Sequence, residues 1–249
     1  MVLYVVTDTY EQYRKNPNWF HTRDTLEEAA GDACIVLHYK QVNLATVSQA
    51  RPWAICHSGG GTDYKDYDVL QDSAYRRVVR EFAVAQIGFC GGHQIIARFF
   101  GSRLGPMRKL RPGEPDLASY SPGYFKEWGV YPVDIVKGDP LFRGFRKRIM
   151  VQEYHYWEVK RLGPALVLLA SSADCRVQAF RHRTKPVYGT QFHPERHSDA
   201  YPDGARILEN FFRIARNARQ DLAGRPLTGS GPVRRTHGRS SSGSSSRGR

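Results

Sequence analysis

The sequence predicts an α/β fold in which helices flank a doubly wound, mostly parallel sheet. The main observation is that short apolar, β-branched runs alternate with amphipathic helical segments over the first 100 residues. Two features stand where such runs end, a glycine-rich loop at residues 58–61 and a glycine-flanked cysteine at position 90. In sheets of this kind, ligands bind beyond the carboxyl ends of the strands, so both features are expected at one edge.

The composition is that of an ordinary globular protein. At 249 residues and 41% hydrophobic content, the chain is long enough for a sizeable core in one large or two small domains. Its four cysteines form no CxxC pair or Cys/His cluster, which predicts no structural metal and a reduced, cytoplasmic compartment. No segment approaches the roughly 20 apolar residues of a membrane helix, so neither secretion nor membrane insertion is expected.

The positive charge is concentrated in the last part of the chain. Residues 222–249 hold six arginines and no acidic residue, and thus account for six of the thirteen net positive charges. Because this segment is rich in Ser, Gly and Arg, we expect a disordered tail after a domain of residues 1–221. It is either a weak polyanion-binding tail or a solvated extension, and the second is favoured because no RNA-binding signature accompanies it.

The expected elements follow the apolar pattern along the chain. Strands are expected at residues 2–6, 33–38, 53–57, 84–89, 129–136, 149–159, 165–170, 176–180 and 187–192. Helices are expected at residues 25–30, 69–82, 91–100 and 204–218, where apolar residues recur at helical spacing. Residues 181–186 are expected to connect the last two strands as a hairpin.

The segment around Cys90 has the pattern of a nucleophile elbow, a sharp turn from strand to helix that exposes its corner side chain. Gly88 and Gly92, two residues to either side, allow the two backbones to pass each other. We expect a strained conformation at the corner, with the thiol facing the positive helix N-terminus, which lowers a thiol pKa. The alternative is a buried structural cysteine, but the pattern makes Cys90 a candidate nucleophile.

Two loops are expected near this corner. The backbone N–H groups of residues 58–61 either face an anion or belong to an ordinary turn. Residues 110–125 contain three prolines and two glycines, together with the aromatic residues Tyr120, Tyr124 and Phe125. They form either a lid or wall of the site or a packed surface loop.

A base for the thiol is expected after the last strand. His193 and Glu195 face the same side in extended backbone, so Glu195 can accept a hydrogen bond from the His193 ring and fix its tautomer. Cys90, His193 and Glu195 thus form a candidate triad with cysteine in place of serine.

Taken together, these segments resemble the class I glutamine amidotransferases, glutaminase domains with a cysteine elbow and a late His-x-Glu pair. The resemblance covers about residues 53–217. It rests on SGG at 58–60, GFCGGHQ at 88–94, EWGV at 127–130, DPLF at 139–142, VQAF at 177–180 and GTQFHPE at 189–195. It implies a flavodoxin-like class I amidotransferase architecture and a glutaminase that uses no cofactor.

The resemblance also implies catalytic roles. Cys90 corresponds to the nucleophile, His193 to the base and then the acid, and Glu195 to the residue that orients the histidine. The backbone N–H groups of Gly60 and Gly91 correspond to the oxyanion hole, whose donors are worth roughly 3 to 4 kcal/mol each.

Substrate binding is implied for Gln94 and for residues 154–156. Many family members carry SHG or NHG at the second place, where it holds the α-amino and α-carboxylate groups of glutamine. This chain has Tyr154, His155 and Tyr156 there. A tyrosine in place of glycine narrows or reshapes the pocket. Gly61 stands where the family usually has proline, which predicts a more mobile oxyanion loop.

The implied reaction is attack of the Cys90 thiolate on the γ-amide of glutamine, giving a γ-glutamyl thioester that water hydrolyses. No GxxxxGK[ST] phosphate loop is present, so ammonia is expected to pass to a separate synthase or acceptor protein. Two alternatives are a stand-alone γ-glutamyl hydrolase or peptidase and a catalytically silent binding or regulatory module. The intact set of Cys90, His193 and Glu195 argues against the silent module.

Overall fold

The computed structural model of this protein describes residues 1–223. Its strands are β1 (Val2–Val6), β2 (Cys34–His38), β3 (Ala54–His57), β4 (Ala85–Phe89), β5 (Arg103–Pro106), β6 (Glu127–Ile135), β7 (Arg148–His155), β8 (Trp157–Arg161), β9 (Leu166–Ser171), β10 (Ala179–His182) and β11 (Val187–Thr190). Its α-helices are α1 (Tyr10–Lys15), α2 (Asn18–Ala30), α3 (Leu44–Ala50), α4 (Ser73–Glu81), α5 (Gly91–Phe99) and α6 (Asp203–Ala223). Of the expected tail, Leu222 and Ala223 continue α6, and the remainder lies outside the described residues.

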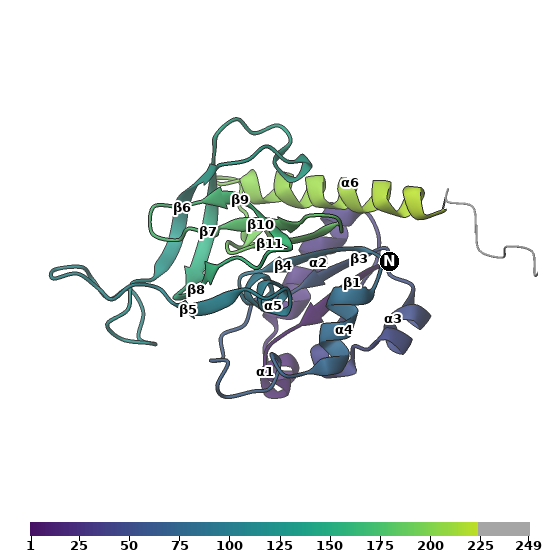
Figure 1. Cartoon of the computed structure of the whole chain (residues 1–249), viewed down its shortest axis with the longest axis horizontal. Helices are drawn as coiled ribbons and strands as arrows, with labels where there is room; N and C mark the ends of the chain where they lie inside the picture. The colour runs from purple at the N-terminus through teal and green to yellow at the C-terminus, as the bar shows by residue number, and fades with distance from the viewer. Residues whose placement is uncertain (224–249) are drawn as a thin grey trace, which may run out of the picture.

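The main sheet has nine strands in the order β2-β1-β3-β4-β11-β10-β9-β6-β7, with helices against both faces (Figure 1). Strands β2, β1, β3, β4 and β11 pair in parallel. Beyond β11 each pair is antiparallel, so β10 and β6 run opposite to the other strands. The mostly parallel sheet expected from the sequence is confirmed, and the carboxyl ends of β1, β3, β4 and β11 lie together at one edge.

Alternate residues of the central strands pack into two separate cores. In β1, Val2, Tyr4 and Val6 belong to the core that includes residues of α2 and α6, whereas Leu3 and Val5 belong to the core that includes residues of α3, α4 and α5. Since successive side chains of a strand point to opposite faces, a strand covered by helices on both sides must be apolar throughout. This is why the sequence identified these strands.

Two helices were not expected from the sequence. The short helices α1 and α3 begin where a side chain caps the first turn: Thr9 accepts from the Gln12 N–H, and Asn43 accepts from the Thr46 N–H. Helix α2 was expected only from residue 25 but begins at Asn18, and the first turn of the helix expected at residues 69–82 is absent, because Asp72 caps α4. Local capping thus set helix boundaries that apolar spacing did not indicate.

One expected strand is divided in two. The apolar run at residues 149–159 was predicted to be continuous, but β7 ends at His155 in the main sheet and β8 begins at Trp157 and pairs with β5 in the second sheet. The chain passes from one sheet to the other at Tyr156. This transition places residues 154–156 beside the carboxyl ends of the parallel strands.

None of the helices within residues 1–223 combines the length and the apolar character needed to cross a membrane.

The close crossing of β4 and α5 depends on two glycines. A Cβ atom on Gly88 would collide with the backbone of Gly92, and a Cβ on Gly92 would lie 2.5 Å from the carbonyl oxygen of His57. Neither obstacle is the end of a flexible side chain, so neither can move aside without shifting a strand or the helix. The elbow pattern predicted from the sequence is therefore a steric requirement of this fold.

We expect Gly88→Ala to lower the free energy of unfolding by about 2 to 3 kcal/mol, because the added methyl group overpacks two backbone segments. Gly138→Ala is the matched control, since a Cβ there meets nothing within 4 Å and should change stability by no more than about 0.5 kcal/mol. Urea unfolding followed by circular dichroism measures both. Equal midpoints for the two variants would contradict the steric argument.

Candidate active site

The residues singled out in the sequence line one cavity of about 580 Å³ at the carboxyl edge of the sheet. They are Gly60, Cys90, Gly91, Gln94, Tyr154, His155, Tyr156, His193 and Glu195. Gly60 follows β3, Cys90 lies between β4 and α5, and His193 follows β11. Four separate stretches of the chain therefore meet where the fold class places a ligand.

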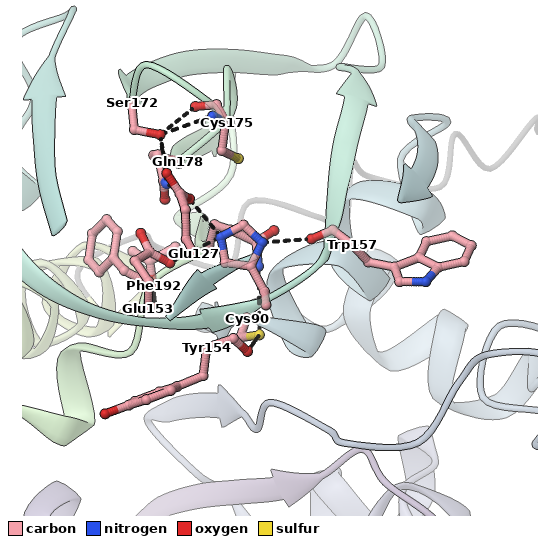
Figure 2. A network of polar contacts seen from close by, with 12 residues as sticks. Cys90, Glu127, Glu153, Tyr154, Trp157, Ser172, Cys175, Gln178 and Phe192 are labelled. Atoms are coloured by element: carbon pink, nitrogen blue, oxygen red, sulfur yellow. Dashed lines mark hydrogen bonds and ion pairs between the residues drawn. The ribbon is translucent and has the colours of Figure 1, made fainter. Parts of the chain in front are cut away.

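Cys90 has the backbone strain expected at an elbow. Its φ is 46° and its ψ is −102°, a conformation that a residue with a Cβ rarely adopts. The side chain is 5% exposed, and its sulfur lies 3.8 Å from the carbonyl oxygen of Tyr154 and 3.6 Å from the Gln191 amide nitrogen (Figure 2). The elbow thus fixes the thiol at the wall of the cavity.

The prediction that the helix N-terminus lowers the Cys90 pKa is wrong. Burial raises the pKa of the thiol to about 12, and the carboxylates of Glu153 and Glu195 also raise it. The backbone N–H of Gly91 lowers it, but this one donor is outweighed by the cost of placing a thiolate in a buried site. At neutral pH, Cys90 is therefore a thiol.

His193 is held by Glu195 as the sequence predicted. The His193 Nδ1 atom lies 2.7 Å from the Glu195 Oε1 atom, and both residues are 6% exposed. Since Nδ1 donates to the carboxylate, the Nε2 atom of the neutral ring keeps its lone pair. A Cβ on Gly59 would lie 3.8 Å from Nε2 and 3.5 Å from the Cys90 Cβ, so the ring and Cys90 flank the same glycine.

The two glycines of the expected oxyanion hole are neighbours. A Cβ on Gly91 would lie 2.9 Å from the backbone nitrogen of Gly60, so any larger residue at position 91 would displace the loop. The loop itself is fixed by Asp8, whose carboxylate accepts hydrogen bonds from the Gly61 N–H at 2.8 Å and the Thr62 hydroxyl at 2.6 Å. A proline at position 61 has no N–H and could not form this bond.

Asp8 was missed in the sequence. The signal that could have identified it is its place, two residues beyond the end of the first buried strand, at the edge where ligands bind. The sequence predicted a more mobile loop from the absence of proline at position 61, but that reasoning did not include the bond between Asp8 and Gly61.

Gln94 lines the cavity, but its amide group is bonded to protein. Its Nε2 atom donates to the carbonyl of Trp157 at 2.7 Å and to the side chain of Gln191 at 3.0 Å. Its Oε1 atom accepts from the Tyr64 hydroxyl at 2.9 Å. In this arrangement Gln94 shapes the cavity wall by connecting α5 to β8 and to Tyr64.

His155 belongs to a buried network behind the cavity. Its Nε2 atom lies 2.8 Å from a Glu127 carboxylate oxygen, and its Nδ1 atom lies 2.9 Å from the carbonyl oxygen of Trp157. Gln178 and Ser172 also donate to Glu127, and Figure 2 shows these residues gathered around its carboxylate. The ring of His155 thus points to protein acceptors and holds the bend between β7 and β8.

Both ring nitrogens of His155 face acceptors, which requires the charged imidazolium. Burial by itself lowers the pKa of His155, but the carboxylates of Glu127 and Glu153 outweigh it and raise the pKa to about 10. Burial raises the pKa of Glu153 to about 7. The network therefore places one fixed positive charge beside two carboxyl groups directly behind Tyr154.

Potential metal ligands also meet in this network, although the sequence predicted no metal. Atoms of Glu127, His155 and Cys175 that could serve as ligands lie within 4.8 Å of one another. A metal needs neutral imidazole and thiolate ligands. Here both nitrogens of His155 are engaged as donors, and burial raises the pKa of Cys175 well above its usual value. The group fits a hydrogen-bonded network better than a metal site.

The tyrosines at positions 154 and 156 form part of the cavity wall. The ring of Tyr154 lies between those of Trp128 and His193, at centroid distances of 5.0 Å and 5.8 Å. The hydroxyl of Tyr156 donates to the carboxylate of Asp63. From the loop at residues 110–125, Tyr120 reaches the cavity and contacts Tyr156, which favours the interpretation of that loop as a wall of the site.

Comparison with known proteins agrees with this geometry. The family model described as "Glutamine amidotransferase class-I" matches residues 21–215. A glutamine-hydrolyzing GMP synthase subunit of Pyrococcus furiosus is 38% identical over 135 residues, which cover 54% of this chain and 62% of that protein. The Thermococcus kodakarensis protein of the same name is 34% identical over 172 residues, covering 69% and 80%. The alignment with the first relative thus spans less than two thirds of its length.

Solved structures share the fold. A glutamine amido transferase of Methylobacillus flagellatus has a TM-score of 0.62 with 15% identity, over 87% of this chain and 94% of that chain. A glutamine amidotransferase of Thermotoga maritima has a TM-score of 0.57 with 14% identity, over 90% and 86%. The family model covers more than half of the chain, and the cysteine elbow and the His193–Glu195 pair occupy one cavity. The chain belongs to the class-I glutamine amidotransferases.

Proposed function

We propose that this chain is a free-standing cytoplasmic glutaminase subunit, which hydrolyses the γ-amide of glutamine and releases ammonia for a separate acceptor enzyme. The observation that carries the proposal is the meeting of Cys90, the His193–Glu195 pair and the N–H groups of Gly60 and Gly91 in one cavity. The relatives are named as one glutamine-hydrolyzing subunit of GMP synthase, which supports an acceptor on another chain.

The first chemical step transfers the γ-glutamyl group to sulfur. The Nε2 atom of His193 takes the Cys90 proton as the sulfur bonds to the γ-carbonyl carbon, and negative charge moves to the carbonyl oxygen. The imidazolium then gives this proton to the leaving nitrogen, the C–N bond breaks, and ammonia departs. In the second step His193 deprotonates a water molecule, which attacks the thioester and restores the Cys90 thiol.

The N–H groups of Gly60 and Gly91 stabilise the oxyanion in both steps. Preformed donors of this kind are effective because they need not reorient when charge develops. Glu195 keeps the proton of neutral His193 on Nδ1 and stabilises the imidazolium, as a buried carboxylate does in other triads.

The high pKa of Cys90 gives the free protein a resting state in which the thiol is protonated. A thiolate forms when His193 accepts the proton, and the transfer is completed as charge passes to the substrate. This arrangement keeps the buried sulfur unreactive until the cavity is filled.

Turnover of glutamine with trapping of the thioester tests the proposal. The purified chain should hydrolyse glutamine and, with hydroxylamine, give γ-glutamyl hydroxamate. Cys90→Ala should abolish both reactions, and His193→Ala should lower kcat by about 10³-fold or more. An unchanged rate in Cys90→Ala would overturn the mechanism, and a chain that forms no thioester with any γ-glutamyl compound is the silent module.

The pKa of Cys90 predicts how its alkylation depends on pH. Below a thiol pKa the thiolate fraction grows tenfold per pH unit, so we expect the rate of iodoacetamide labelling at Cys90 to rise about tenfold per unit between pH 7 and pH 9. Glu153→Gln removes a charge that raises the Cys90 pKa and should make labelling at pH 8 faster. Peptide mass spectrometry locates the label, with Cys90→Ser as the blank. A rate that is constant over this range would indicate a preformed thiolate and contradict the assignment.

Asp8 is expected to act by positioning the oxyanion loop. Asp8→Asn leaves one acceptor oxygen where Gly61 and Thr62 used two, so the Gly60 N–H loses its fixed place. We expect kcat for glutamine to fall by about tenfold, less than the loss of a whole donor, with KM changed by less than about twofold. Asp66→Asn, at an exposed position of the same loop, is the control. A rise in KM with unchanged kcat would show that Asp8 binds substrate instead.

A further inference from the structure

A row of aromatic rings extends from His193 along one side of the cavity. Tyr154 contacts His193, Trp128 contacts Tyr154 at a centroid distance of 5.0 Å, Tyr120 contacts Trp128 at 5.7 Å, and Tyr156 contacts Tyr120 at 5.4 Å. We call Tyr120, Trp128, Tyr154 and Tyr156 the aromatic wall. The four side chains come from β6, β7, the β7–β8 bend and the loop before β6.

The aromatic wall is not part of either hydrophobic core. Trp128 is 40% exposed and Tyr120 is 36% exposed, although both line the cavity. Large aromatic side chains that face a cavity and remain accessible are typical of ligand contacts, since folding itself gains little from them. Their role is therefore to be sought in what enters the cavity.

The wall is held in place before any ligand arrives. The Tyr154 hydroxyl donates to Gln152 at 3.0 Å, and the Tyr156 hydroxyl donates to Asp63. The loop that carries Tyr120 is braced from within by the buried amine of Lys126, which binds the Asp116 carboxylate and the carbonyl oxygens of Ser121 and Tyr124. A preformed wall of this kind orders few groups on binding.

The place of the wall follows the path of the leaving group. In the proposed mechanism His193 must protonate the departing nitrogen, so a substituent on that nitrogen lies on the His193 side of the γ-carbonyl. The aromatic wall begins at the ring of His193 and continues outward. Glutamine loses only ammonia, which leaves the rings without a ligand. The cavity volume of about 580 Å³ lies within the range of roughly 300–1,000 Å³ that holds much larger ligands.

One cation also faces this side of the cavity. The guanidinium of Arg196 lies 5.1 Å from the centroid of the Tyr154 ring, and within residues 1–223 it forms no ion pair. An unpaired arginine at a cavity wall suits a carboxylate on the ligand and disfavours a second cation. The expected leaving amine therefore combines an aromatic ring with a carboxylate.

We propose that this site takes γ-glutamyl dipeptides whose second residue is aromatic, with its ring on the aromatic wall and its carboxylate on Arg196. The proposal rests on the proposed function, because it uses the same Cys90 thioester. The sulfur displaces the amino acid where it would displace ammonia: the S–C bond forms, the peptide C–N bond breaks, and the proton from Cys90 passes through His193 to the leaving amine. One water molecule then releases glutamate.

Three substrates test the proposal with the purified chain: γ-glutamylphenylalanine, γ-glutamylglycine and glutamine. We expect kcat/KM for γ-glutamylphenylalanine to exceed that for γ-glutamylglycine by about tenfold or more, as one well-placed aromatic contact allows. Release of phenylalanine and glutamate is measured directly.

Variants assign the preference to the wall. Trp128→Ala should lower kcat/KM for γ-glutamylphenylalanine by about tenfold and that for γ-glutamylglycine by less than about twofold, with Trp128→Phe restoring most of the loss. Arg196→Gln should impair both dipeptides and spare glutamine. Phe20→Ala removes an aromatic ring that is 56% exposed and does not line the cavity, and should change neither rate.

The possible failures are distinguishable. Equal rates for the two dipeptides, or equal losses for both in Trp128→Ala, would overturn the aromatic subsite and leave the glutaminase proposal standing. A chain that forms no thioester at Cys90 with any of the three substrates would overturn the proposed function itself.

Discussion

The site depends on one steric constraint, the close contact of β4 with α5 at Gly88 and Gly92. Because no side chain separates these backbones, the turn between them is sharp enough to force Cys90 into its strained conformation. The same contact brings the start of α5 against the glycine loop after β3. The strand ends that carry Gly60, Cys90 and His193 are therefore fixed relative to one another by the sheet, and the geometry of the site follows from the pairing of β3, β4 and β11.

The electrostatics of the site follow from burial. A thiol, two carboxyl groups and a charged imidazole stand close together with little access to water, so each changes the ionisation of the others. Burial raises the pKa of Cys90 and Glu153, whereas the carboxylates raise that of His155 against the effect of burial. The charged network stands behind the cavity wall and maintains its shape, whereas the catalytic pair faces the cavity.

Much of the fold was predictable because its physical causes are local. Apolar strands and amphipathic helices leave a periodic pattern, and the elbow leaves small residues at fixed positions around Cys90. The division of residues 149–159 between two sheets was not predictable, since both halves are apolar strands and the difference lies in their distant partners. The same holds for the pKa of Cys90: the helix N-terminus is visible in the sequence, but the carboxylates of Glu153 and Glu195 reach the sulfur only through the fold.

The bond between Asp8 and Gly61 links two positions that lie far apart in the sequence. A proline at position 61 would remove the N–H and leave one oxygen of a buried carboxylate without that partner, whereas a neutral residue at position 8 would leave the glycine loop unanchored. Neither change alone preserves the arrangement. The two positions are thus epistatic: relatives with proline in the loop should hold it by other contacts, and the residue at the end of the first strand should differ with them.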